Sequence, residues 1–189
     1  MTTIVEQAFE TNVLHKDVHM SLVKNLDKIS LATGVPKKFI WTEDTDNVCT
    51  KHEWKFIVKC RKYRSDGYAG LIITNNSTQI HSAEEKMMMM AGKLIRNFID
   101  ARLVIVQDLL DEMKEGYKDD SDVLLIPNFF IPKKGIALPD WQVNTLQGLL
   151  IKRLCAGDLT ILYVQSMDDL KKSYGAAMYN HLNQHYKIL

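Results

Sequence analysis

Histidines at helical spacing are the first residues of this sequence that could do chemistry, by binding a metal ion. His181 and His185 are four residues apart, as are His15 and His19, so each pair would share one face of a helix. Two such imidazoles can hold a divalent cation, but a structural zinc site usually has four ligands. The sequence near either pair does not supply the full set of further ligands that would complete a site. We therefore expect solvated or capping histidines and no bound metal.

A row of cations could instead contact phosphate groups. The segment KHEWKFIVKCRKY (51–63) has a helical period that places Trp54, Ile57 and Cys60 on one side, and on the other side Lys51, Lys55, Lys59 and Lys62. Together with Arg64, these lysines could follow a nucleic-acid backbone while Trp54 or Tyr63 stacks on a base. Lysine rims are also common on the solvated side of amphipathic helices, and Trp54 falls on the apolar side. We favour a solvated face and keep nucleic-acid contact as the alternative.

These side chains need a framework, and the apolar pattern predicts one. Short apolar runs typical of buried parallel strands occur at 70–74, 103–106, 123–126 and 160–164. Helical periods cover 3–32, 51–63, 82–99, 108–115, 140–155 and 168–187, the last with a break at Tyr174–Gly175. Strands that alternate with such helices predict a parallel sheet covered on both faces. We divide the chain into an N-terminal helical segment (1–32), a linker (33–50) and a main domain (51–189), and we expect Met87–Met90 to fill gaps in the core.

The order of these elements resembles the ATPase domain of DnaC-type bacterial helicase loaders and of the related IstB-type transposition ATPases. GVPKKF (34–39) is similar to a "GIPxxF" phrase upstream of that domain. GLIITNNSTQIHSAE (70–84) lies where that family has GLLLxGxxGxGKT, and it matches without a gap. The resemblance covers roughly residues 30–185. It implies an α/β, three-layer P-loop NTPase-like (AAA+-like) domain with a central parallel sheet and a short helical N-terminal segment.

The phosphate loop that this resemblance implies has lost its defining residues. Its glycines let the backbone turn and bring N–H groups close to the phosphates. The three glycine positions hold Asn75, Thr78 and Ile80, and the lysine position holds His81, which is shorter and mostly neutral at pH 7. Ser82, at the position of the magnesium-binding hydroxyl, is the one residue that fits the motif.

The acidic pair of the family is also absent. In DVLLIPNFF (122–130), Pro127 and Asn128 occupy the two positions, and neither can ligate a metal ion as a carboxylate or accept a proton from water. Gln165, at the end of the run TILYVQ, could still serve as the polar sensor residue that follows the fourth strand in this family. We expect no catalytic residue in this part of the chain.

The two arginines of the family's C-terminal "GxRxxxR" stretch are also absent from this sequence. GAAMYNH (175–181) places Ala177 and His181 at those positions, and no arginine follows Arg153. Where it has been measured, a transition-state arginine accounts for roughly 10³ to 10⁵ in rate. We therefore expect a pseudo-ATPase that is not an enzyme and has no nucleotide cofactor.

Length and composition restrict the number of domains and the classes of partner. The 189 residues suit one globular domain, and a net charge of +1 gives no global attraction to nucleic acid or to acidic membranes. Three cysteines without a C-x-x-C pair argue against a disulfide framework. Without an apolar signal segment or a run of about 18 apolar residues, we expect a soluble, cytoplasmic protein with no membrane partner.

Three functions follow from these expectations. We favour a catalytically inactive relative of helicase loaders that acts in DNA replication by binding a replicative helicase or its loader, with self-association into a homo-oligomer as an option. The alternative is a DNA-binding accessory factor of replication or transposition. A third reading is an ATPase with an unconventional loop, in which nucleotide still binds at 75–82.

Overall fold

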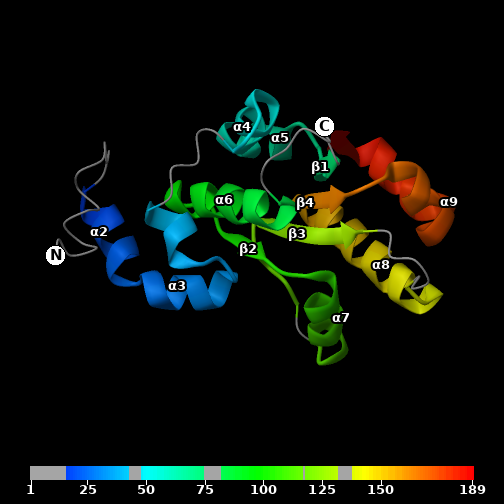
Figure 1. Ribbon diagram of the computed structural model, residues 1–189, viewed down its shortest axis with the longest axis horizontal. Helices are drawn as coiled ribbons and strands as arrows, with labels where there is room; N and C mark the ends of the chain where they lie inside the picture. The colour runs from blue at the N-terminus through cyan, green and yellow to red at the C-terminus, as the bar shows by residue number, and fades with distance from the viewer. Residues whose placement is uncertain (1–15, 43–47, 75–81, 117, 132–137) are drawn as a thin grey trace.

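Five parallel strands form the centre of the molecule (Figure 1). The computed structural model describes residues 16–42, 48–74, 82–116, 118–131 and 138–189. The strands lie in the order β2-β3-β4-β1-β5. Their bounds are β1 Gly70–Thr74, β2 Ala101–Leu103, β3 Val123–Phe130, β4 Leu159–Val164 and β5 Tyr186–Ile188.

Helices cover both faces of this sheet, which confirms the three-layer α/β architecture (Figure 1). Because side chains alternate along a strand, Leu71 and Ile73 enter one core cluster and Ile72 enters the other. The first layer contains α2 Lys16–Lys24, α3 Leu26–Thr33, the π-helix η1 Lys38–Thr42, α4 Lys51–Val58, α5 Cys60–Ser65 and α6 Ala83–Arg96. The second contains α7 Val106–Lys114, α8 Asp140–Ala156 and α9 Met167–His185.

Local sequence signals account for several helix ends. Thr50 and Glu53 form a capping box at the start of α4, and Ser166 caps α9 by accepting a hydrogen bond from the N–H of Asp169. The expected break at Tyr174–Gly175 is confirmed, because Gly175 has φ 83° and ψ 169° within α9. Met87, Met89 and Met90 are buried, as expected for core filling.

The interval 33–50 is the main correction to the sequence analysis, because its described part is not a linker. Val35 and Ile40 are fully buried, and η1 packs against α6. A Cβ on Gly92 of α6 would lie 2.0 Å from the carbonyl oxygen of Phe39, so the close approach of these two segments requires a glycine. The GVPKKF phrase is therefore part of the core.

Several predicted helices and strands differ in length from those in the structure. The helix predicted to reach residue 187 ends at His185, because Tyr186–Ile188 pairs with β1 as an edge strand. β3 continues four residues beyond Ile126, with a register shift between Ile126 and Phe130 in its pairing with β4. The long helices expected at 3–32 and 51–63 are interrupted at Asn25 and Lys59, and residues 1–15 lie outside the described part. None of the described helices combines the length and apolarity needed to cross a membrane.

Candidate functional site

The carboxyl ends of the parallel strands meet at one edge of the sheet, where α/β folds place their ligand sites. β1 ends at Thr74, whose hydroxyl donates a 2.7 Å hydrogen bond to the carbonyl of Leu189. α6 begins after Ser82, whose Oγ accepts a 3.1 Å bond from the N–H of Glu85. Strand and helix therefore flank the segment 75–81 in the order that a phosphate loop requires. Asn75, Thr78, Ile80 and His81 lie outside the described residues.

The two positions of the acidic pair lie within β3. Pro127 is buried, and its missing N–H falls where the pairing of β3 with β4 shifts register. Asn128 is half-buried, and its Oδ1 accepts a 2.9 Å hydrogen bond from the N–H of Val106, the first residue of α7. This amide satisfies one of the donors that a helix N-terminus leaves open. Position 128 therefore connects β3 to α7.

Gln165 lies at the same edge, directly after β4. Its N–H donates a 2.9 Å bond to the carbonyl of Phe130, so the chain at the end of β4 is tied to the end of β3. The side chain is half-buried. The sensor-like position is thus at the edge where the sequence predicted it, and its role toward a nucleotide stays a prediction.

The two positions at which the sequence resemblance predicts arginines lie on α9 beyond the break at Gly175. Ala177 is exposed, whereas His181 is half-buried, with its ring centroid 5.1 Å from that of His185 and 6.0 Å from that of Tyr186. Nε2 of His181 is buried without a hydrogen-bond partner among the described residues. Burial and then the neighbouring His185 lower the pKa of His181, which favours the neutral imidazole.

Metal binding by the histidine pairs gains no support from their surroundings. Within the described part of the chain, no group of three or more potential ligands surrounds a common point. His19 packs between two aromatic rings, with centroids 5.7 Å from Trp41 and 4.9 Å from Phe98. His15 lies outside the described residues.

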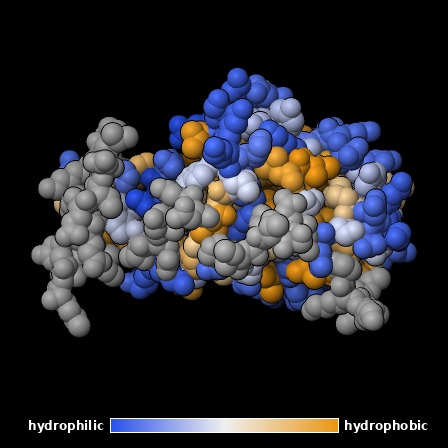
Figure 2. Space-filling view, turned by 45° about the horizontal axis from the view of Figure 1, so that its top comes forward, coloured by the Kyte–Doolittle hydropathy of each residue, from blue (hydrophilic) through white to orange (hydrophobic). Residues whose placement is uncertain are grey.

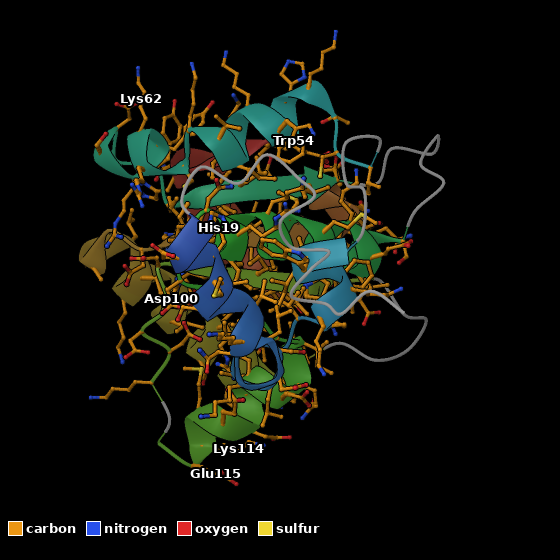
Figure 3. The ribbon with its side chains drawn as sticks, turned by 90° about the vertical axis from the view of Figure 1, so that its left-hand side faces the viewer. His19, Trp54, Lys62, Asp100, Lys114 and Glu115 are labelled. Carbon is orange, nitrogen blue, oxygen red and sulfur yellow. The ribbon has the colours of Figure 1, made fainter. Side chains whose placement is uncertain are left out.

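The lysine row lies on the outer side of α4 and α5. Lys51, Lys55, Lys59 and Lys62 are all exposed, and Trp54 is half-buried against the core, with the ammonium of Lys93 5.3 Å from its ring centroid. Figure 3 shows Lys62 pointing away from the body of the molecule.

Arg64 is an exception that the helical period did not reveal. Its guanidinium donates to Asp122 at 2.6 Å and to Asp158 at 2.9 Å, so it joins α5 to the amino-terminal edge of the sheet. Arg64 therefore differs from the four lysines of the row in being ion-paired within the fold. A small cavity of about 50 Å³ lies beside it, lined by Cys60, Arg61, Arg64, Ile99, Asp122, Val123 and Leu159.

Two buried ionic clusters were missed in the sequence analysis. Nζ of Lys86 lies 3.0 Å from Oε1 of Glu53, and their side chains are 1% and 3% exposed. Arg153, also buried, donates to Asp119 at 2.8 Å, to the hydroxyl of Thr160 and to two backbone carbonyls. A charged residue at an apolar position of a helix is the signal that could have indicated each cluster, because such a residue is rarely buried without a partner.

Two solved structures are similar to this chain. The crystal structure of the DnaC helicase loader matches with a TM-score of 0.53 and 15% sequence identity, covering 82% of this chain and 98% of that chain. A structure of the replication initiator DnaA bound to AMPPCP and single-stranded DNA matches with a TM-score of 0.49 and 10% identity, covering 76% of this chain and 51% of that chain. No protein-family model matches the chain, and no curated protein matches it in sequence. At this identity, the similarity to the DnaC structure establishes an AAA+-like, P-loop NTPase-like fold.

Proposed function

We propose that this chain is a catalytically inactive protein of the helicase-loader type that acts in DNA replication by binding a replicative helicase or its loader. The observation that carries the proposal is the pair Pro127 and Asn128 on β3. On a sheet of this type, the end of that strand is where the family has its acidic pair. Here one residue is a buried proline, and the other is an asparagine whose amide oxygen accepts a hydrogen bond from the first N–H of α7.

The chemistry of these two side chains supports the loss of hydrolysis. Activating a water molecule for phosphoryl transfer needs a group that positions it and a metal ion held by carboxylates. An amide whose oxygen already accepts a backbone hydrogen bond supplies neither. The sequence changes at Ile80, His81 and Ala177 point in the same direction, because each removes a glycine or a cation that would contact the phosphates.

Binding a partner protein requires an exposed apolar surface, and this chain has one at the carboxyl edge of the sheet. Two large apolar side chains are exposed near the carboxyl edge, Ile131 after β3 at 42% and Trp141 at the start of α8 at 52%. Exposed tryptophans are frequent centres of protein interfaces, because they bury a large apolar area at low entropic cost. We assign Trp141 to the partner contact.

Nucleotide binding is tested by calorimetry on the full chain with ATP and magnesium. An active loader from the same host, titrated under identical conditions, is the positive control. We expect no measurable heat of binding for this chain and a normal isotherm for the loader. Tight, magnesium-dependent binding would contradict the proposal and favour an ATPase with an unconventional loop.

Partner binding is tested separately with the tagged chain, by pull-down from the native host and then with purified helicase and purified loader. We expect stoichiometric recovery of one of the two proteins and a change in its ATP turnover when the chain is added. Recovery of neither protein, with the chain folded by circular dichroism, would reject this partner class.

A further inference from the structure

The outer face of α4 and α5 concentrates positive charge that the fold does not use. Residues 51–64 contain six lysine and arginine side chains and one acidic one, so this stretch is more positive than the whole chain, whose net charge is +1. Figure 2 shows hydrophilic side chains covering these two helices at the top of the view. We call this surface the α4–α5 face. Its members are Lys51, Lys55, Lys59, Arg61 and Lys62, all exposed.

Ion pairing distinguishes the cations next to this face from its own members. Arg64 is bound by Asp122 and Asp158, and the acidic residue of the stretch, Glu53, is buried against Lys86. Among the described residues, none of the five members of the α4–α5 face has an acidic partner within 4.0 Å. The fold therefore pairs Arg64 and Lys86 with carboxylates, whereas these five side chains remain in solvent.

The apolar sides of the same helices are already in use. Phe56, Ile57 and Cys60 are 1%, 2% and 3% exposed, so they belong to the core. A helix that lies on a membrane would need this apolar side to enter the lipid. A protein interface is normally centred on aromatic and apolar side chains, with lysine depleted, and Val58 is the single large apolar side chain exposed on α4 and α5. A membrane or a partner protein therefore fits this surface less well than a row of phosphates.

The indole ring of Trp54 and the phenol ring of Tyr63 are already packed against other side chains. Trp54 packs on the core with Lys93 above its ring, and Tyr63 stacks on Phe56 at a centroid distance of 4.8 Å. The Tyr63 hydroxyl also accepts a hydrogen bond from Lys187. Proteins that bind single strands combine a basic groove with free aromatic platforms. This face offers lysines without such platforms, which suits the backbone of a duplex, whose bases are stacked already.

We propose that the α4–α5 face binds the phosphate backbone of double-stranded nucleic acid without reading its sequence. Successive lysines four residues apart are spaced by about 6 Å along the helix, so several can contact one strand together.

The test is a fluorescence anisotropy titration of the full chain with a labelled duplex, between about 50 and 200 mM salt. We expect the logarithm of the association constant to fall linearly with the logarithm of salt, with a slope of about −0.9 for each phosphate contacted. Lys55→Ala with Lys62→Ala should weaken binding at least about tenfold at the lowest salt and reduce the slope by about 2. The matched control is Lys28→Ala with Lys152→Ala, which removes the same charge from exposed positions on α3 and α8 and should change neither quantity.

Several outcomes would overturn this proposal. Equal losses in both double variants would mean that only net charge matters. Tighter binding of the single strand than of the duplex would assign the surface to unpaired bases. Absence of duplex binding, or binding only to phosphatidylserine vesicles or to an acidic protein, would remove nucleic acid as the ligand. Since neither helicase nor ATP is present, these results are independent of the function proposed above.

Discussion

The side-chain amide of Asn128 accepts a hydrogen bond from the backbone N–H of Val106, with 2.9 Å between the two atoms. The bond joins the end of β3 to the first turn of α7, the helix that precedes this strand in the sequence. Ile105, at the N-cap position of α7, has no side chain that could accept a hydrogen bond, so Asn128 provides that function from a neighbouring strand. The residue that the sequence resemblance places at a catalytic position therefore has a structural role in this fold.

Asn128→Ala should lower the free energy of unfolding by about 1 kcal/mol, the usual effect of removing a helix cap. Asn128→Asp should keep most of that stability, because a carboxylate accepts the same bond and its charge suits a helix N-terminus. Urea denaturation of the three proteins measures both effects. The Asp variant should still not hydrolyse ATP, and equal destabilisation of the two variants would show that the cap is unimportant.

Lys86→Met should destabilise the protein by about 3–5 kcal/mol, because it leaves the carboxylate of Glu53 buried without its cation. Glu53→Gln combined with Lys86→Met should recover part of this loss. Glutamine removes the charge but can still accept the hydrogen bond from the N–H of Thr50 that completes the capping box. A double-mutant cycle in urea measures the coupling. Additive losses from the two single changes would mean that the pair is not coupled.

These two contacts show why the sequence predicted the helices and strands better than the side-chain contacts between them. The run at Gly70–Thr74 and the break at Gly175 depend on local pattern, so both were predicted correctly. Glu53 and Lys86 are separated by 33 residues, and Arg64 pairs with an aspartate 94 residues away. Periodicity along one segment cannot indicate such partners, because they meet only when the sheet has formed.

The edge strand β5 was missed for a related reason. Tyr186–Ile188 is three residues long and continues directly from α9, so its alternation is too short to outweigh the helical pattern before it. Its strand conformation comes from pairing with Gly70–Ile72 of β1. The positions 75–81, which the sequence resemblance assigns to a phosphate loop, lie outside the described residues, whereas Ser82, Pro127, Asn128 and Gln165 have defined places at the carboxyl edge.

Thiol labelling of the native protein should modify Cys155 first, because it is exposed on α8. Burial, and then the nearby Glu53, raise the pKa of Cys49 to about 12, and burial raises the pKa of Cys60. Since the thiolate is the reactive form, both should react slowly at pH 8. Absorbance with a thiol reagent should therefore show one fast thiol for each chain, and none in Cys155→Ser. A fast thiol in that variant would contradict the protection of Cys49 and Cys60.

Stability should fall as the pH drops below about 6.5, in part because of His181. Burial, followed by His185, lowers its pKa in the folded state, whereas in the unfolded chain it titrates near its ordinary value of 6.5. Below that pH the unfolded state binds the proton more readily, so protonation favours unfolding; above it the effect is absent. Urea midpoints at several pH values should fall less steeply for His181→Gln. His52→Gln, at an exposed position on α4, is the control, and an equal change in slope for the two variants would contradict this assignment.

Trp141→Ala should reduce recovery of the replication partner at least about tenfold, since truncating a tryptophan at the centre of an interface commonly costs 2 kcal/mol or more. The folded chain should change little in stability, because this side chain is 52% exposed and its ring lies beside the ammonium of Lys114 rather than in the core. Ile151→Ala is the matched control, an apolar side chain on the same helix at 43% exposure. Pull-downs with purified helicase and loader compare the two variants with the unaltered chain. If both variants lose the partner equally, the whole of α8 contributes to the contact; if neither does, the partner binds elsewhere and Trp141 has no part in it.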